Sequence, residues 1–563
     1  MENDRGKGSI LAGKANGCAI LLLALSAGGV TAQEFQARCA AAMGVAGAGR
    51  VTEALFVPAG PVQLAPPAPP GVTGPAPDHC LIRGRIDERT GIDGKPYWIG
   101  YELRLPAQWN GKFFFQGGGG VDGVVRPALG MIGSGVTPPN GLSNGYAVAS
   151  TDAGHLEEPG PIGPYLFGLD PRARADKGYS SIPPVAAAAK AAIAAVYARS
   201  PSRAYFVGCS NGGRQAMVAT QRYPDLFDGV IAAAPAYRVP LAAIDGIGHT
   251  KALMSIAPRD AGGNPDLGRA LTMDDLKLVA SGILAACDAA DGLADGMVQN
   301  VAACRFDPAV LTCKPGQNSA CLPETKVRVL DQLYKGTRNA EGRPVYSTWP
   351  YDPGLASPGW TAWRTGTPGK SPPDARNVTL IPGSVAYAFM SPPEQPADLL
   401  AWSLAFDFDR DTAKVMKGAG GFEAGMEFEA ATSTDVDRYK ARGGKILFTH
   451  GVADPIFSAL DTISYVGQLE ARYGADARGF ARLFLVPGMN HCAGGPATDQ
   501  FDALAALDRW VETGEAPDVI MATARKTPDV PWPGRTRPLC AHPKVATYKG
   551  SGNVEAASSF ECR

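Results

Sequence analysis

The chain has 563 residues, of which 45% are hydrophobic and 19% charged, and its 53 basic and 54 acidic side chains leave a net charge of −1. This balance excludes a strongly basic protein and argues against a nucleic acid or an anionic membrane surface as the main partner. The apolar content excludes general disorder and is enough for a large core.

The N-terminus has the pattern of a secretory signal peptide. Arg5, Lys7 and Lys14 form a basic region, which the apolar run 18–27 and the small residues 30–32 follow. The apolar run is too short to span a bilayer. We expect residues 1–32 to be removed, leaving a secreted or periplasmic protein without stable membrane insertion. The alternative is an N-terminal helix buried in the mature fold.

Strands and helices alternate in two stretches of the chain, after an irregular Pro-rich segment at 58–77. The first stretch predicts strands at 97–105, 112–116, 146–151 and 204–208, and helices at 185–199 and 211–223. The second predicts strands at 445–449 and 482–486 and a helix at 501–515. Such alternation predicts a mostly parallel sheet with helices on both faces.

The alternation stops between residues 247 and 434, where four of the mature cysteines and many Pro, Gly and Trp residues lie. The simplest interpretation is a large inserted lid domain. The expected organisation is therefore one α/β domain formed by residues 33–246 and 435–563, interrupted by a lid at 247–434.

The segment Gly208-Cys209-Ser210-Asn211-Gly212 matches the motif G-x-S-x-G between an expected strand and an expected helix. In the α/β-hydrolase fold this motif forms a sharp turn that exposes a nucleophilic serine above the sheet. The sequence therefore predicts an α/β-hydrolase core with Ser210 as its nucleophile.

A serine nucleophile needs a base and an acid, which follow it in that fold in the order serine, acid, histidine. His491 follows an expected strand and comes after every candidate acid, and Asp454 follows the strand before it. We expect Ser210 to attack an acyl carbon, His491 to carry the proton, and Asp454 to orient the imidazole. Asp454 could instead be an ordinary turn residue, and we interpret His450 as a structural histidine near the acid loop.

The mature chain has ten cysteines, an even number that suggests five disulfides in an exported protein. Sequence proximity favours the pairs Cys287–Cys304, Cys313–Cys321, Cys540–Cys562 and Cys39–Cys80, leaving Cys209 for Cys492. Cys209 directly precedes Ser210 and Cys492 directly follows His491, so a bond between them would link the nucleophile loop to the base loop. Zinc is the competing idea, but the chain has no CxxC or paired-histidine spacing.

Two loops offer groups for binding. A run of four glycines, 117–120, follows the expected strand 112–116, and its backbone N–H groups could stabilise an oxyanion together with that of Asn211. Asp288, Asp291 and Asp295 bring three carboxylates into a Gly-containing loop, a density that suits calcium, although the spacing is not that of an EF-hand. A solvated acidic loop is the alternative.

With these elements in place, the chain resembles the tannase and feruloyl esterase family, in which a disulfide joins the residues beside the catalytic serine and histidine. The resemblance runs from about residue 38 to 562. It includes the strings RTGIDG (89–94), FGLDP (167–171), CDAADGLADG (287–296), FSALDT (457–462) and GFARLFLVPGMNHC (479–492).

The resemblance implies a monomeric, exported carboxylesterase acting on small aromatic esters, with a structural Ca²⁺ and no organic cofactor. A monoester of terephthalic acid is the first substrate that it implies, and esters of ferulic or tannic acids are the alternative. A catalytically silent binding protein is a third possibility, which the intact serine, acid and histidine set argues against.

The resemblance also assigns site residues by position. It implies Gly120 and Asn211 as oxyanion donors, and the calcium ligands are Asp288, Asp291 and Asp295 with the carbonyls of Leu293 and Met297. Arg376 would bind the free carboxylate of the substrate, and Trp363 and Phe457 would flank its aromatic ring. Gly119 and Leu380 complete the pocket, at positions where similar family members carry a serine and a phenylalanine, so the aromatic wall is thinner here.

Overall fold

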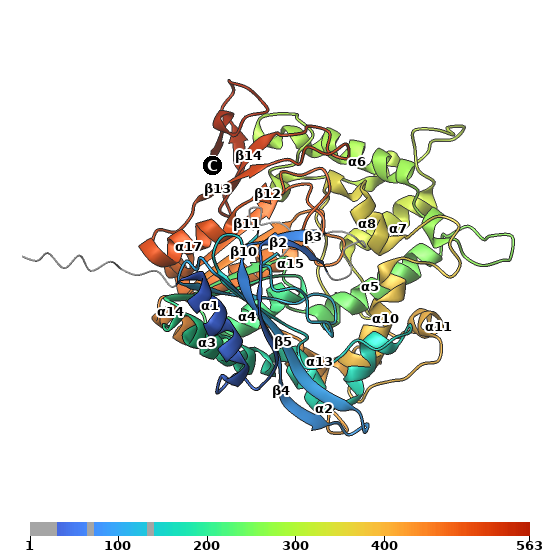
Figure 1. Ribbon diagram of the computed structural model, residues 1–563. Coiled ribbons are helices and arrows are strands. Elements are labelled where there is room, and N and C mark those ends of the chain that lie inside the picture. Colours follow the sequence, from blue (N-terminus) through green and yellow to red (C-terminus); the bar gives the residue numbers. More distant parts are fainter. Residues whose placement is uncertain (1–30, 65–72, 132–139) are drawn as a thin grey trace, which may run out of the picture.

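The structure is a computed structural model that describes residues 31–64, 73–131 and 140–563 (Figure 1). The predicted signal peptide falls almost wholly outside these residues. Within the described ranges, no single helix has the length and apolar content needed to cross a membrane. Residues 171–180 and 182–197 meet that criterion only together, with a bend of 58° between them.

The central sheet has nine strands among the described residues. They are β1 (Arg50–Val57), β4 (His79–Thr90), β5 (Pro96–Pro106), β6 (Lys112–Gln116), β7 (Ala147–Thr151), β8 (Arg203–Cys209), β9 (Gly229–Ala233), β10 (Lys445–Gly451) and β11 (Ala481–Val486). Their spatial order is β1-β4-β5-β7-β6-β8-β9-β10-β11. All pairs from β7 to β11 are parallel, whereas β1, β4 and β5 add an antiparallel edge. The prediction of a mostly parallel sheet is confirmed.

Helices cover both faces of this sheet because its side chains alternate between two apolar cores. Phe113 and Phe115 of β6 enter one core, and Phe114 enters the other. The first core is closed by α1 (Ala32–Ala41), α3 (Ile182–Tyr197), α4 (Asn211–Arg222) and α15 (Ala459–Tyr473), and the second by α17 (Ala503–Thr513). The continuous apolar runs of the central strands follow from burial on both faces.

Most predicted elements agree with the structure to within a few residues, but two differences stand out. The segment 58–77, predicted to be irregular, contains β2 (Gly60–Gln63) and β3 (Thr73–Ala76), which form a short antiparallel pair. Gly and Pro make up much of both strands, so the sequence lacks the alternation of apolar and polar residues that would predict them. Strands β1, β4 and β9 were not predicted either; in β9 (GVIAA), three of the five residues are Gly or Ala, which have a low strand propensity.

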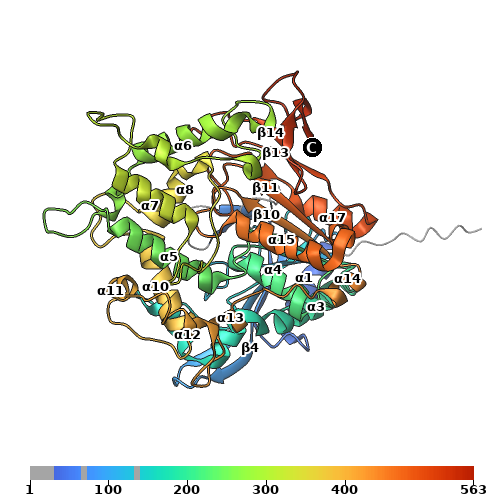
Figure 2. The ribbon, with the colours of Figure 1, turned by 180° about the vertical axis from the view of Figure 1, so that it is seen from behind.

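The segment between β9 and β10 builds a third apolar core beside the sheet. Its longer helices are α5 (Val239–Met254), α6 (Met273–Cys287) and α7 (Glu324–Lys335), and shorter ones are α8 (Pro358–Arg364), α9 (Arg376–Thr379), α10 (Ile381–Gly383), α11 (Leu399–Leu404), α12 (Ala413–Met416) and α13 (Gly425–Phe428). Both views place α5, α6, α7 and α8 on the same side of the sheet (Figures 1 and 2). Residue 247, where we expected the insertion to begin, lies within α5.

Smaller elements complete the chain. Helices α2 (Pro171–Ala175), α14 (Asp437–Ala441) and α16 (Ala477–Phe480) are short, β12 (Gln500–Phe501), β13 (Val519–Thr523) and β14 (Thr536–Cys540) form a three-stranded sheet, and β15 (Ala546–Tyr548) pairs with β16 (Phe560–Cys562). This C-terminal part packs beside α6, where both views show β13 and β14 (Figures 1 and 2).

Candidate active site

Ser210 occupies the turn between strand β8 and helix α4. Its φ is +64°, a left-handed backbone conformation that is uncommon for a serine and is found where the surrounding structure enforces it. A Cβ atom on Gly208 would lie 2.5 Å from the carbonyl carbon of Gly212, and one on Gly212 would lie 2.7 Å from the carbonyl oxygen of Gly118. Glycine at both positions therefore allows the turn to be this tight.

Asp454 and His491 meet at the carboxyl ends of the neighbouring strands β10 and β11. The Nδ1 atom of His491 lies 2.7 Å from Oδ2 of Asp454. The other carboxylate oxygen accepts the backbone N–H groups of Ile456 at 2.8 Å and Phe457 at 3.1 Å. An imidazole bound to a carboxylate through Nδ1 keeps Nε2 for proton exchange, as general base catalysis requires.

His450 packs behind this pair. Its Nδ1 lies 2.9 Å from the hydroxyl of Thr462, and its Nε2 lies 3.0 Å from the carbonyl oxygen of Phe457 and 3.5 Å from Oδ2 of Asp454. Burial alone would raise the pKa of Asp454, but the imidazoles of His491 and His450 outweigh it and hold that pKa below its ordinary value. The acid is therefore kept as a carboxylate.

A disulfide joins the nucleophile loop to the base loop. Cys209 and Cys492 are bonded, with their Cα atoms 6.0 Å apart and 283 residues between them in sequence. The other disulfides are Cys39–Cys80, Cys287–Cys304, Cys313–Cys321 and Cys540–Cys562. The five predicted pairs are confirmed.

A cavity opens at the serine. The predicted residues that line it are Gly120, Ser210, Asn211, Trp363, Leu380 and Phe457. The imidazole of His491 has its ring centre 5.4 Å from that of Phe457 and 6.2 Å from that of Trp363. Apolar groups from the inserted segment and from the acid loop thus form the walls, as in most small-molecule sites.

The glycine run after β6 reaches the cavity at one position. Gly120, with a φ of +62°, lines it beside Asn211, whereas Gly119 is not among the lining residues. The backbone N–H of Gly119 donates to Oδ1 of Asp122 at 3.0 Å, and that of Gly118 donates to the side chain of Gln215 at 2.9 Å. Backbone donors near Ser210 are therefore those of Gly120 and Asn211.

Arg376 lies at the edge of this cavity and does not line it. It begins helix α9, is exposed, and has its guanidinium carbon 5.2 Å from the centre of the Trp363 ring. Trp363 itself lines the cavity from helix α8. The structure therefore places the cation one side chain away from the space next to Ser210.

Lys177 also lines the cavity, although no sequence pattern predicts this. Its ammonium is buried and lies 2.6 Å from the carboxylate of Glu429, which is also 3.3 Å from Arg214. Burial lowers the pKa of Lys177, while Glu429 acts in the opposite direction. The residue lies on a π-helical turn, Asp176–Ser180, that matches no sequence motif, so only the tertiary structure could find it.

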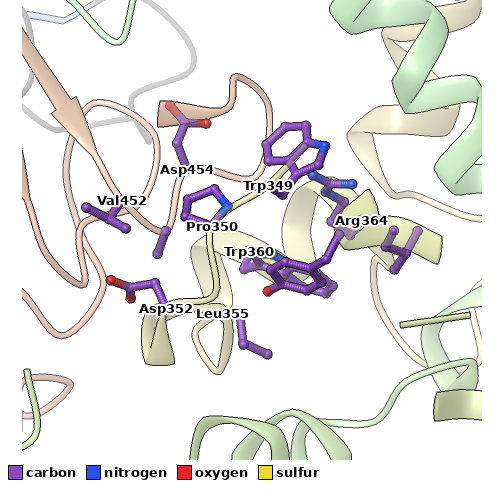
Figure 3. Close-up of a pocket in the computed structure, with 11 residues that line it drawn as sticks. Trp349, Pro350, Asp352, Leu355, Trp360, Arg364, Val452 and Asp454 are labelled. Atoms are coloured by element: carbon purple, nitrogen blue, oxygen red, sulfur yellow. The ribbon is translucent and has the colours of Figure 1, made fainter. Parts of the chain in front are cut away.

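A second, smaller cavity adjoins Asp454 (Figure 3). Arg364, the neighbour of Trp363 on α8, is buried there, with its guanidinium carbon 4.3 Å from the centre of the Trp349 ring, and it contacts Nδ1 of His249. Burial lowers the pKa of Arg364 to about 10, although Asp245 and Asp454 oppose this shift. These contacts fix helix α8, and with it Trp363, against the catalytic side of the molecule.

The predicted calcium loop follows helix α6. Asp288 accepts the backbone N–H groups of Gly296 at 2.8 Å and Met297 at 3.2 Å, and Asp291 accepts that of Leu293 at 3.1 Å. One oxygen of Asp291 is buried without a hydrogen-bond partner. Burial, reinforced by the neighbouring carboxylates, raises the pKa of Asp291 to about 7.

The third carboxylate of the loop has cationic partners. Asp295 pairs with the guanidinium of Arg537 and lies 3.5 Å from that of Arg535. Within the described ranges, no group of three His, Cys, Asp or Glu side chains is arranged to hold a metal ion. Asp288 and the unpartnered oxygen of Asp291 fit a hard cation, and Asp295 fits one less well.

Comparisons with known proteins show the family of the chain. The family described as tannase and feruloyl esterase matches residues 85–563. The chain is 42% identical over 513 residues to a mono(2-hydroxyethyl) terephthalate hydrolase from Piscinibacter sakaiensis, covering 86% of this chain and 85% of that protein. It is 30% identical to a probable feruloyl esterase from Arthroderma benhamiae, covering 89% of each.

A solved structure shares the fold. Feruloyl esterase B from Aspergillus oryzae superposes with a TM-score of 0.73 at 22% identity, over 94% of this chain and all of that one. The mixed sheet with helices on both faces is therefore of the α/β-hydrolase type found in these esterases.

Proposed function

Because the chain belongs to the tannase and feruloyl esterase family and is thereby a carboxylic ester hydrolase, we propose that its substrates are monoesters of aromatic diacids. The substrate that we propose first is mono(2-hydroxyethyl) terephthalate, which would be cleaved to terephthalate and ethylene glycol. The relative with 42% identity carries this substrate in its name.

The proposed reaction proceeds through an acyl-enzyme. Ser210 Oγ attacks the ester carbonyl carbon as His491 Nε2 accepts the hydroxyl proton, and Asp454 stabilises the imidazolium through Nδ1. The backbone N–H groups of Gly120 and Asn211 donate to the oxyanion. His491 then gives its proton to the departing ethylene glycol, and a water molecule releases terephthalate by the same steps in reverse order.

The observation that carries the choice of substrate is Arg376 beside Trp363. Among the described residues, no carboxylate lies within ion-pair distance of the Arg376 guanidinium, which is exposed at the edge of the cavity. A benzene ring between Trp363 and Phe457 would point its para substituent away from Ser210. A guanidinium binds a carboxylate through two parallel hydrogen bonds, so a free acid at that position would be recognised there.

Hydrolysis of feruloyl or other phenolic acid esters by the same machinery is the second candidate. The relative from Arthroderma benhamiae, a probable feruloyl esterase, supports it. Leu380 supports it as well, because a leucine leaves more room beside the ring than an aromatic residue would.

Two further proposals concern the setting of the enzyme. The basic and apolar N-terminus and the five disulfides support export with removal of residues 1–32, and the segment 247–434 would act as a lid. A structural calcium would be held by Asp288, Asp291 and Asp295 with the carbonyls of Leu293 and Met297. The unpartnered Asp291 oxygen supports this site, whereas the pairing of Asp295 with Arg537 would weaken its share.

The test is a comparison of kcat/KM for mono(2-hydroxyethyl) terephthalate, methyl ferulate and methyl gallate on one oxidised, calcium-supplied preparation. We expect the terephthalate monoester to be preferred by about tenfold or more, since each 1.4 kcal/mol of a charge-assisted contact gives a factor of ten. A preference for ferulate or gallate would replace the first candidate by the second. Hydrolysis of none of the three would reject both.

A further inference from the structure

The glycine run at 117–120 is folded around the side chain of a single buried residue, Asp122. The backbone N–H of Gly119 donates to Oδ1 of Asp122 at 3.0 Å, and the backbone N–H of Asp122 donates to the carbonyl oxygen of Gly119 at 3.1 Å. A Cβ atom on Gly118 would lie 1.8 Å from the same Oδ1. The loop can therefore close around this carboxylate only because it lacks side chains.

The other oxygen of Asp122 contacts the helix that begins at the nucleophile. Oδ2 accepts the side-chain amides of Asn211 at 2.7 Å and of Gln215 at 2.9 Å. The side-chain oxygen Oε1 of Gln215 in turn accepts the backbone N–H of Gly118 at 2.9 Å. The glycine loop and the first turn of α4 are thus joined to each other by hydrogen bonds that converge on one carboxylate.

The backbone at this position also has a positive φ. Asp122 has a φ of +60°, close to the +64° of Ser210, and only 8% of its surface is exposed. Left-handed conformations of residues other than glycine persist where the structure around them enforces them, and they are frequent at active sites. Here the hydrogen bonds of Asp122 to the loop and to α4 provide that enforcement.

Buried side chains of both charges lie around the carboxylate of Asp122. Burial raises the pKa of Asp122, and the cations of Lys177 and Arg214 act against this rise. Both cations also pair with Glu429. Two acids and two bases are therefore buried together beside the cavity that Lys177 lines, where an unpaired charge would be costly.

We propose that Asp122 is the positioning residue of the oxyanion hole. It holds the loop that carries the Gly120 N–H against the helix turn that carries the Asn211 N–H, so that both donors point to one oxygen. It does not touch the substrate. This inference rests on the proposed function in two points: Ser210 is taken as the nucleophile of an ester hydrolase, and the N–H groups of Gly120 and Asn211 are taken as the oxyanion donors.

The test compares Asp122→Asn with the wild type in steady-state hydrolysis and in binding of benzeneboronic acid. An asparagine keeps the shape but replaces one acceptor oxygen with an NH₂ group, which would face the donors of Asn211 and Gln215 or of Gly119. Loss of aligned oxyanion donors lowers kcat by about 100-fold, and KM should change by no more than about threefold. The boronate adduct of Ser210 mimics the tetrahedral intermediate, so its Ki should rise by a similar factor, while the Kd of the product acid should stay unchanged.

Asp87→Asn is the matched control, because Asp87 also has a positive φ, of 52°, but pairs with Arg172 at the exposed surface. It should leave kcat and the boronate Ki unchanged. If Asp122→Asn does not fold, Gln215→Met breaks the bonds to Gly118 and Asp122 while keeping the volume, and should lower kcat with little change in KM. Unchanged kcat, or equal losses in the binding of the boronate and of the product, would overturn the proposal.

Kinetics are measured on p-nitrophenyl acetate as well as on the terephthalate monoester, because an oxyanion hole serves every ester. A wild type that cleaves only p-nitrophenyl acetate would reject the proposed aromatic substrate and still test Asp122.

Discussion

The two sides of the cavity are built in different ways. On one side, Ser210, Asp454 and His491 follow three strands of the same sheet, and a disulfide links the first of these loops to the last. On the other side, Trp363, Arg376 and Leu380 come from the short helices α8 and α9 and the turn that follows. In the proposed reaction, the sheet side supplies the groups that make and break bonds, and the inserted side would supply those that contact the acid part of the substrate.

Because of this difference, mutations on the two sides should affect the enzyme in different ways. A group that exchanges protons or bonds in the transition state cannot be displaced without a large loss of rate. A wall that only contacts the substrate changes its affinity by the free energy of that contact. Changes on the sheet side should therefore lower kcat, and changes on the inserted side should alter the choice among substrates.

Removal of the nucleophile should have the largest effect. Ser210→Ala should lower kcat by about 10⁴-fold or more, since without the hydroxyl only the oxyanion donors and binding remain. Labelling by a fluorophosphonate should disappear in the same variant. Ser281→Ala, which removes an exposed hydroxyl on α6, is the control and should behave as the wild type. If Ser210→Ala retained activity, the assignment of Ser210 as the nucleophile would be refuted.

Replacement of the acid, Asp454, should have the second-largest effect. Asp454→Asn replaces the carboxylate that orients His491 and should lower kcat by about 10³- to 10⁴-fold. Asp352→Asn is the matched control, because Asp352 is also buried, lines the same small cavity (Figure 3) and accepts the backbone N–H groups of Gly354 and Gly488. It should lower the melting temperature but change kcat by no more than about threefold. Equal losses of kcat in both variants would reduce Asp454 to a structural residue.

The two regions also hold disulfides that can be compared directly. Loss of Cys209–Cys492 in a double alanine variant should lower kcat by about 10- to 100-fold, because a displacement near 1 Å between nucleophile and base has that effect. Loss of Cys313–Cys321, whose partners are 8 residues apart in the inserted segment, should leave kcat unchanged. The rates are measured at a temperature where both variants are folded. A similar kcat in both would contradict the proposed link between the two catalytic loops.

Calcium removal should have the smallest effect on catalysis. Chelation should lower the melting temperature by a few degrees, since a ligand that binds only the folded state stabilises it, and kcat should change little because the loop lies outside the cavity. Asp291→Asn should abolish this calcium dependence, and Asp274→Asn, which changes an exposed aspartate on α6, should retain it. If chelation does not change the melting temperature of the wild type, the proposed structural calcium site is rejected.

The sheet side could be predicted from the sequence, and the inserted side in large part could not. The strand–turn–helix around Ser210 and the loops after β10 and β11 are local patterns, and the cysteines beside Ser210 and His491 indicated their proximity. Asp122 and Lys177 carry no such local signal. Their roles arise from contacts with Asn211 and Glu429, which are 89 and 252 residues away in the chain.

The inserted side depends on long-range packing for its geometry. Helix α8 is held in place by the contacts of Arg364 with His249 and Trp349. The periodicity of hydrophobic residues along the sequence does not predict these contacts. The resemblance to known esterases named Trp363 and Arg376, but only the structure shows that Trp363 lines the cavity and that Arg376 stacks on it from outside.

The most direct test of this division of labour uses two substrates that differ in one group. Mono(2-hydroxyethyl) terephthalate has a free carboxylate, and bis(2-hydroxyethyl) terephthalate has a second neutral ester in its place. Arg376→Ala should lower kcat/KM for the monoester by about tenfold or more and leave that for the diester within about threefold of the wild type. An equal loss for both substrates would contradict the account, because Arg376 would then support the cavity without recognising the acid.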